Sequence, residues 1–206
     1  MKNLIIHPDD RSTDFLKRIY STAEKPTVLS EFPKDSVDEI PKEIMHYDRV
    51  MMMGHGTPDG LFAMNADPID EKAFELACKS KDPKALDAFD FWGDLVVSDR
   101  TARVLRYYND NIFIWCNANK FVKEHNLKGF YSGMFISEVS EAKMCGLGDV
   151  PKGMVRESNR MFSRIMSRHI NEKLMEMFKN VVVEYGNFAM ENPVAKYNWD
   201  RLGIST

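Results

Sequence analysis

The sequence contains few cysteines, no long apolar run and no excess of charge of either sign. Its 206 residues include only three cysteines, Cys78, Cys116 and Cys145, and no Cys-x-x-Cys pair. Such a small and odd number argues against a disulfide framework and against a cysteine-rich zinc site. No apolar run approaches the roughly 18 residues that a membrane-spanning helix needs. Together with an N-terminal apolar segment too short for a signal peptide, this predicts a cytoplasmic protein without a membrane partner.

Acidic and basic residues nearly balance. The chain carries 28 Lys and Arg against 31 Asp and Glu, a formal net charge of −3, which argues against nucleic acid as a partner. Hydrophobic residues make up 44% and charged residues 29%, the balance of a folded globular protein with its own core. Nothing in the sequence specifies an oligomeric state.

Short apolar segments alternate with segments of helical periodicity along the first 150 residues. The apolar segments predict strands at 3–7, 27–29, 49–53, 111–116 and 129–136. The periodic segments predict helices at 12–20, 35–45, 68–79, 98–108, 117–124 and 137–144, with a polar insertion at 81–91. This alternation predicts a three-layer α/β/α sandwich with a mostly parallel sheet.

The C-terminal third has a different pattern. No glycine or proline occurs between Val155 and Tyr185, and apolar residues recur there at helical spacing. We therefore expect a long C-terminal helix packed on the sandwich, followed by an irregular tail whose Tyr197 and Trp199 dock on the body. The whole chain is predicted to be a single domain, with the core sheet and helices in residues 1–150 and a helical extension in residues 151–206.

Two chemically reactive side chains follow predicted strands. His55, between Gly54 and Gly56, follows the strand at 49–53, and Cys116 ends the strand at 111–116. The carboxyl ends of parallel strands lie at one edge of a sheet, where ligands and catalytic groups gather. A thiol and an imidazole at that edge can form a nucleophile–base pair, and an adjacent imidazolium is expected to lower the thiol pKa below its usual ~8.5. The N–H of Gly56 can hold the oxyanion of an acyl-transfer intermediate.

The order of these motifs resembles that of the caspase-like cysteine peptidases, which include caspases, metacaspases, legumains, gingipains, clostripain, separases and CHAT domains. In that family one apolar strand ends in His-Gly and a second ends in the nucleophilic Cys, as do Val50–Gly56 and Ile112–Cys116 here. The segment Asp59–Phe62 also looks like the short hairpin that CHAT-type members carry after the histidine. The resemblance covers roughly residues 1–145.

This resemblance implies a caspase-like fold and a cysteine peptidase or related thiol hydrolase that acts on a peptide or protein substrate without a cofactor. Cys116 would attack the acyl carbon and His55 would protonate the leaving group, while the backbone N–H groups of Gly56 and Cys116 would hold the oxyanion. Asp59 and Glu138 are candidate substrate-binding carboxylates.

Two positions depart from the family pattern and favour a second interpretation. Many members carry a small residue before the cysteine and an acidic residue one or two positions before it, where this chain has Trp115 and Ile114. The alternative is a non-catalytic interaction module on a caspase-like fold, with Cys116 a buried strand-end residue.

A third hypothesis rests on His7-Pro8-Asp9-Asp10, directly after the first predicted strand. The motif resembles the start of the zinc-dependent deacetylases of the LmbE type, in which the His and the second Asp bind zinc and the first Asp is the base. Here Arg11 replaces the Glu that follows in that family. The competing interpretation is a turn in which Asp9 and Asp10 prepare the start of the next helix.

Overall fold

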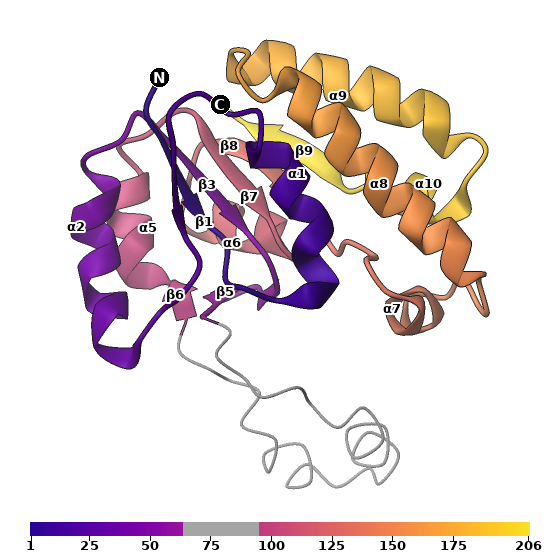
Figure 1. Ribbon diagram of the computed structural model, residues 1–206, viewed down its shortest axis with the longest axis horizontal. Coiled ribbons are helices and arrows are strands. Elements are labelled where there is room, and N and C mark those ends of the chain that lie inside the picture. The colour runs from indigo at the N-terminus through magenta and orange to yellow at the C-terminus, as the bar shows by residue number, and fades with distance from the viewer. Residues whose placement is uncertain (64–94) are drawn as a thin grey trace, which may run out of the picture.

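The computed structural model describes residues 1–63 and 95–206. Figure 1 shows a central sheet with helices on both sides and both chain termini at the same end of the molecule. The helix expected at 68–79, the insertion expected at 81–91 and Cys78 lie outside the described residues.

The central sheet has six strands in the order β2-β1-β3-β7-β8-β9. These strands are β1 (Asn3–Ile6), β2 (Pro26–Leu29), β3 (Arg49–Met53), β7 (Asn111–Ile114), β8 (Gly129–Ser132) and β9 (Leu202–Ser205). Every neighbouring pair is parallel except β8 and β9, which are antiparallel. The predicted mostly parallel sheet is therefore confirmed.

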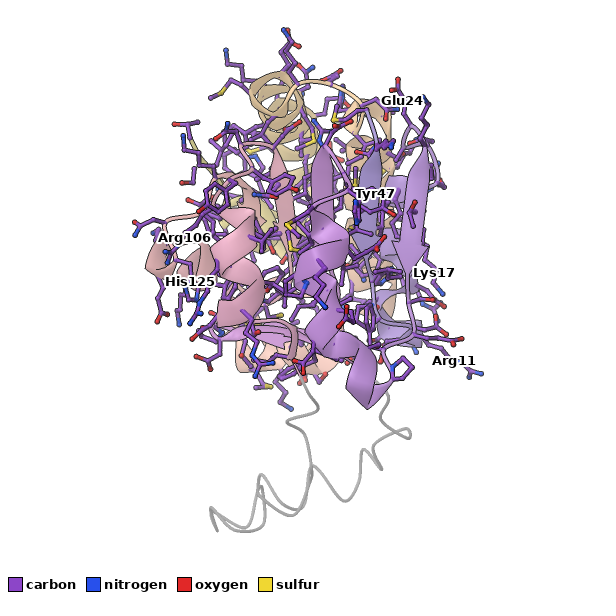
Figure 2. The ribbon with its side chains drawn as sticks, turned by 90° about the vertical axis from the view of Figure 1, so that its left-hand side faces the viewer. Arg11, Lys17, Glu24, Tyr47, Arg106 and His125 are labelled. Carbon is purple, nitrogen blue, oxygen red and sulfur yellow. The ribbon has the colours of Figure 1, made fainter. Side chains whose placement is uncertain are left out.

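Helices cover both faces of the sheet, which makes the molecule a three-layer sandwich as predicted (Figure 1). One face packs against α2 (Ile40–Ile44), α5 (Asp99–Leu105) and α6 (Ala118–Glu124). The other packs against α1 (Lys17–Tyr20), α8 (Lys152–His169) and α9 (Leu174–Ala189). Successive residues of a strand point to opposite faces, so Met52 joins the first layer and Met51 and Met53 the second. Figure 2 looks onto the first layer, with α2 and α5 in front of the sheet.

Short 3-10 helices precede two of these helices. They are η1 (Arg11–Leu16), which leads into α1, and η2 (Lys34–Glu39), which leads into α2. The predicted helix at 35–45 is therefore confirmed as a helical segment, but it changes from 3-10 to α geometry at Ile40, directly before Pro41. Proline is tolerated at the first turn of an α-helix, where its missing N–H has no partner to lose.

A second, smaller sheet follows β3 and lies at the lower end of the view in Figure 1. It is antiparallel, in the order β4-β5-β6, with strands β4 (Gly56–Thr57), β5 (Gly60–Phe62) and β6 (Leu95–Val97). The hairpin of β4 and β5 is the one expected after His55, whereas β6 was not predicted.

The C-terminal third is helical as predicted, but it divides into more elements than expected. The helices α8 and α9 pack side by side, separated by a turn at residues 170–173. In this turn the Asn171 side chain accepts a hydrogen bond from the Glu24 N–H at 2.9 Å and donates one to the Thr22 carbonyl at 2.8 Å. The tail is also regular: it forms α10 (Pro193–Trp199) and the sheet strand β9. The expectation of an irregular tail was wrong.

A fully buried arginine ties the start of β3 to the turn between α8 and α9. The Arg49 side chain has 0% exposure, and its Nε donates to the Asp110 carboxylate at 2.9 Å. Its terminal nitrogens donate to the carbonyls of Ile170 and Glu172, the latter at 2.8 Å. One guanidinium therefore satisfies the Asp110 carboxylate and two backbone carbonyls of the turn between α8 and α9.

Candidate active site

His55 and Cys116 lie at the same edge of the sheet. β3 and β7 are adjacent and parallel, with Met53 paired to Ile114, and each reactive residue follows its strand by two positions. Both side chains line one small cavity of about 20 Å³, whose other lining residues are Thr13, Phe15, Leu16, Gly54, Ile114, Trp115, Phe135 and Ser137. This volume is enough for about one water molecule. The structure thus brings the two predicted site residues together, in the place that the strand order indicated.

The His55 ring is held by two residues that sequence reasoning did not connect with it. Its Nε2 lies 2.6 Å from the Ser12 hydroxyl and 3.8 Å from an oxygen of the Asp10 carboxylate. In the described part of the chain its Nδ1 has no hydrogen-bond partner. Because Ser12 is 43 positions from His55 in the sequence, only the packing of η1 beside the end of β3 reveals the contact.

Cys116 is partly buried, and the contacts of its thiol are with residues other than His55. Its Sγ lies 3.5 Å from the Phe135 carbonyl and 3.8 Å from the Glu141 carboxylate. Within residues 1–63 and 95–206 no hydrogen bond joins Cys116 to His55. Burial, and second the negative charge of Glu141, raise the pKa of the Cys116 thiol to about 12. The expectation of a lowered thiol pKa was therefore wrong for this structure, in which the thiol keeps its proton at neutral pH.

Replacing Glu141 with glutamine should make Cys116 more reactive. The amide still accepts hydrogen bonds, but it removes the charge that disfavours the thiolate, so the thiol pKa falls. A tenfold gain in thiolate per pKa unit is partly offset by weaker nucleophilicity, so we expect alkylation to accelerate roughly three- to tenfold. The measurement is the rate of iodoacetamide labelling of Cys116 at pH 8, read by peptide mass mapping. Glu138→Gln removes the same charge three residues away and serves as the control. Equal rates in the two variants would contradict the assigned contact.

Neither of the two candidate substrate-binding carboxylates is among the described residues that line the cavity. Glu138 is exposed and forms the N-cap of α7 (Val139–Met144), in a reciprocal capping box with Glu141. Asp59 is exposed at the tip of the β4–β5 hairpin, where its N–H donates to the Thr57 hydroxyl. The carboxylate that reaches Cys116 is Glu141, because the start of α7 at Val139 places the third residue of the helix, not its cap, beside the thiol.

Trp115 joins the Cys116 strand to the hairpin that follows His55. Its indole N–H donates to the Thr57 carbonyl at 3.0 Å, and its ring lies against Gly56. A Cβ on Gly56 would lie 2.4 Å from both the Trp115 ring and the Gly60 carbonyl oxygen. A glycine is thus required at position 56, where the β4–β5 hairpin closely approaches Trp115. Trp115, which differs from the small residue of the caspase-like pattern, fixes the hairpin after His55 relative to the strand that carries Cys116.

The substitution Gly56→Ala should therefore destabilise the protein and displace the hairpin. Overpacking of this kind costs about 1–3 kcal/mol. Gly153→Ala is the matched control: it lies in the first turn of α8 with nothing within 4 Å of an added Cβ, and alanine there should stabilise by about 0.5–1 kcal/mol. Urea unfolding of both variants measures the difference. A Gly56→Ala protein as stable as wild type would contradict the packing described.

The part of the cavity wall that follows β8 is fixed by the C-terminal helices. The Asn198 side chain of α10 accepts from the Ile136 N–H at 2.7 Å and donates to the Ile136 carbonyl at 2.9 Å. This pair of bonds holds the segment after β8, which supplies Phe135 and Ser137 to the cavity. The Phe135 ring is also stacked on Phe15 at a centroid distance of 6.2 Å and packs at a tilt against Phe162 at 4.8 Å.

Side chains of the motif His7-Pro8-Asp9-Asp10 make hydrogen bonds and ion pairs within the protein. Both ring nitrogens of His7 are hydrogen-bonded, Nδ1 to the Tyr20 hydroxyl at 2.9 Å and Nε2 to the Thr13 hydroxyl at 3.1 Å. Burial, and second the charge of Lys17, lower the pKa of His7 to about 4, so the ring is neutral.

The acidic residues of this motif have roles of their own. Asp9 pairs with Lys17 at 2.8 Å, and Asp10 is the N-cap of η1, where its carboxylate accepts from the Ser12 N–H. Arg11 points away from the body of the protein (Figure 2). The competing interpretation of this motif, a turn that prepares the next helix, is confirmed for Asp10.

Within the described ranges, no group of three or more His, Cys, Asp or Glu side chains is placed to hold a metal ion, and no helix has the length and apolar character to cross a membrane. The chain matches no protein-family model, no curated protein and no solved structure.

Proposed function

We propose that this protein is a thiol-dependent hydrolase of the caspase-like type, which cleaves an amide bond of a peptide or protein substrate. The observation that carries the proposal is the placement of His55 and Cys116 beyond adjacent parallel strands, lining one cavity. Acyl transfer requires at least a nucleophile and a base close together. Here the two residues reach one sheet edge from different strands.

In this mechanism His55 acts as a general base before it acts as an acid. The Cys116 thiol is protonated at rest, so its proton passes to the imidazole as the sulfur forms a bond to the substrate carbonyl carbon. The tetrahedral oxyanion is held by the N–H groups of Gly56 and Cys116. The C–N bond then breaks as the imidazolium gives its proton to the leaving amine. Water finally hydrolyses the thioester, which returns the proton to the thiol.

The site suggests how a substrate is held. A cavity of about 20 Å³ cannot accept a substrate side chain, so the peptide lies across its mouth or the wall formed by Phe135 moves. Asp59, at the exposed hairpin tip, is available for a basic group of the substrate. The reaction itself calls for no cofactor, and a thiol nucleophile works only where it stays reduced, which fits the cytoplasm.

A panel of peptidyl chloromethyl ketones tests the proposal. The panel should vary the residue next to the ketone among Arg, Lys, Asp, Asn, Ala and Phe. We expect at least one to form an adduct on Cys116, as the sulfur displaces chloride, and we expect the adduct to disappear in His55→Ala. Cys145→Ser is the matched control, because Cys145 is also a free, partly buried cysteine. Failure of every peptide to label Cys116, or labelling that persists without His55, would overturn the proposal.

The alternative is a non-catalytic interaction module on the same scaffold. It is favoured by one observation, the contact of the Cys116 thiol with the Glu141 carboxylate, which opposes formation of the thiolate. An interaction module predicts a Cys116 that resists all peptide electrophiles while the fold is intact. The same labelling experiment therefore separates the two functions.

A further inference from the structure

The strongest unassigned feature of the site is the chain of contacts Asp10–Ser12–His55. The Ser12 hydroxyl lies between the Asp10 carboxylate and Nε2 of His55, within hydrogen-bond distance of both. We propose that Asp10 and Ser12 are positioning residues that fix His55 in the tautomer protonated at Nε2, so that Nδ1 is the nitrogen that exchanges the proton with Cys116. This inference rests on the proposed function and deepens it.

The tautomer follows from counting protons. A serine hydroxyl has one proton to donate, and an ionised carboxylate can only accept. In the hydrogen bond between Ser12 and Asp10 the carboxylate therefore accepts, and the serine hydroxyl uses its one proton there. Ser12 can then only accept from the imidazole, so Nε2 of His55 carries a proton. A neutral imidazole has one N–H, which leaves Nδ1 with its lone pair free to act as a base.

The positioning residues are themselves held in place. Asp10 also accepts the Ser12 backbone N–H at 2.6 Å, as the N-cap of η1, and its carbonyl accepts the Thr13 hydroxyl at 3.1 Å. Thr13 is buried and accepts from His7, which in turn bonds to Tyr20. The loop between β1 and η1 is thus anchored in the core, which is what a group that orients a catalytic side chain requires.

The arrangement also suits the charged state of His55 during the reaction. When Nδ1 takes the thiol proton, the ring becomes a cation that still donates through Nε2 to Ser12. The Asp10 carboxylate lies 3.8 Å from Nε2, with a side-chain exposure of 23%. A carboxylate at this distance and degree of burial stabilises the imidazolium without taking its proton, as the orienting acid of a catalytic triad does.

The first test measures the tautomer directly and does not depend on activity. In protein labelled with ¹⁵N-histidine, long-range ¹H–¹⁵N spectra distinguish a protonated Nε2 from a protonated Nδ1, and the His55→Ala spectrum identifies the His55 signals. We expect wild type to show an Nε2–H that exchanges slowly with water, and Ser12→Ala to lose this protection. A wild-type ring protonated at Nδ1 would overturn the inference.

The second test measures the consequence for catalysis. With the chloromethyl ketone that labels Cys116 fastest, we expect Ser12→Ala and Asp10→Asn to slow adduct formation by at least about tenfold, because an imidazole without its orienting partner spends less time in the working tautomer. Ser12→Thr keeps the hydroxyl and should stay within about threefold of wild type. Asp9→Asn is the matched control, because Asp9 pairs with Lys17 instead.

A slower rate of adduct formation in these variants can be distinguished from a loss of folding. Asparagine caps a helix as well as aspartate does, so Asp10→Asn keeps the start of η1, and melting temperatures check each variant. Adduct formation that depends on His55 but is unchanged in Ser12→Ala and Asp10→Asn overturns this inference and leaves the proposed function standing. A wild-type protein that forms no adduct overturns the proposed function, and with it the catalytic role of the two residues.

Discussion

Replacing Arg49 with alanine should lower the free energy of unfolding by about 3–5 kcal/mol, because removing one partner of a buried ion pair leaves the other charge uncompensated. The Asp110 carboxylate, with 27% side-chain exposure, would lose its counter-ion. Its Oδ1 is buried and has no hydrogen-bond partner among the described residues. The carbonyls of Ile170 and Glu172 would lose their donor as well, and a buried carbonyl without a partner costs about 1–3 kcal/mol.

Urea unfolding followed by circular dichroism measures this loss. Arg100→Ala is the matched control, because Arg100 also pairs with an aspartate, Asp38, but both side chains are 68% exposed. A pair of that kind contributes less than about 1 kcal/mol. If Arg49→Ala does not fold, Arg49→Met keeps most of the side-chain volume and isolates the loss of charge and hydrogen bonds. A loss in either Arg49 variant no larger than that of Arg100→Ala would show that the buried contacts contribute little.

Under the function proposed above, replacing His55 with alanine should slow hydrolysis of a peptide substrate by about 10²–10⁴-fold, the usual contribution of a positioned general acid–base group. The effect is expected to be mainly on kcat, because His55 acts on the proton being transferred and not on the bound peptide. Cys116→Ala should abolish the reaction, since no other nucleophile is proposed.

The controls for this prediction separate chemistry from folding. His46→Ala removes an exposed histidine that follows α2, and it should leave the rate unchanged. The double variant His55→Ala, Cys116→Ala should be no slower than Cys116→Ala alone, because residues that act as a unit are not additive. A His55→Ala enzyme within tenfold of wild type would exclude His55 as the acid–base group.

The parts of the fold that local sequence determines were predictable. Residues Arg49–Met53 form β3 with the predicted bounds, because a short and largely apolar run is typical of a strand covered on both faces. The position where β3 ends could be predicted as well. This is why the sequence could place His55 and Cys116 at the same edge of the sheet. Both predictions depend only on alternation along the chain and on the general geometry of parallel sheets.

The parts that long-range contacts determine were not predictable. No glycine or proline marks the end of α8; instead, Asn171 bonds to residues near the end of α1, and Arg49 takes the Ile170 carbonyl. Whether Glu138 or Glu141 contacts the Cys116 thiol depends on where α7 begins. Helix ends are the feature that a sequence pattern predicts least reliably. Likewise, Ser12 meets His55 only because η1 packs beside the end of β3.

The position of β9 has a consequence for the timing of folding during synthesis. β9 follows every other described strand in the sequence but pairs along the whole of β8, and it runs antiparallel to the other described strands of this sheet. Until residues 202–205 have left the ribosome, β8 presents an unpaired edge, which is a template for association with another chain. Asn198, which holds the cavity wall, lies just before β9 in the sequence and emerges together with it. The nascent chain therefore completes this sheet and the wall of the candidate site together, after the segments that carry His55 and Cys116 have already emerged.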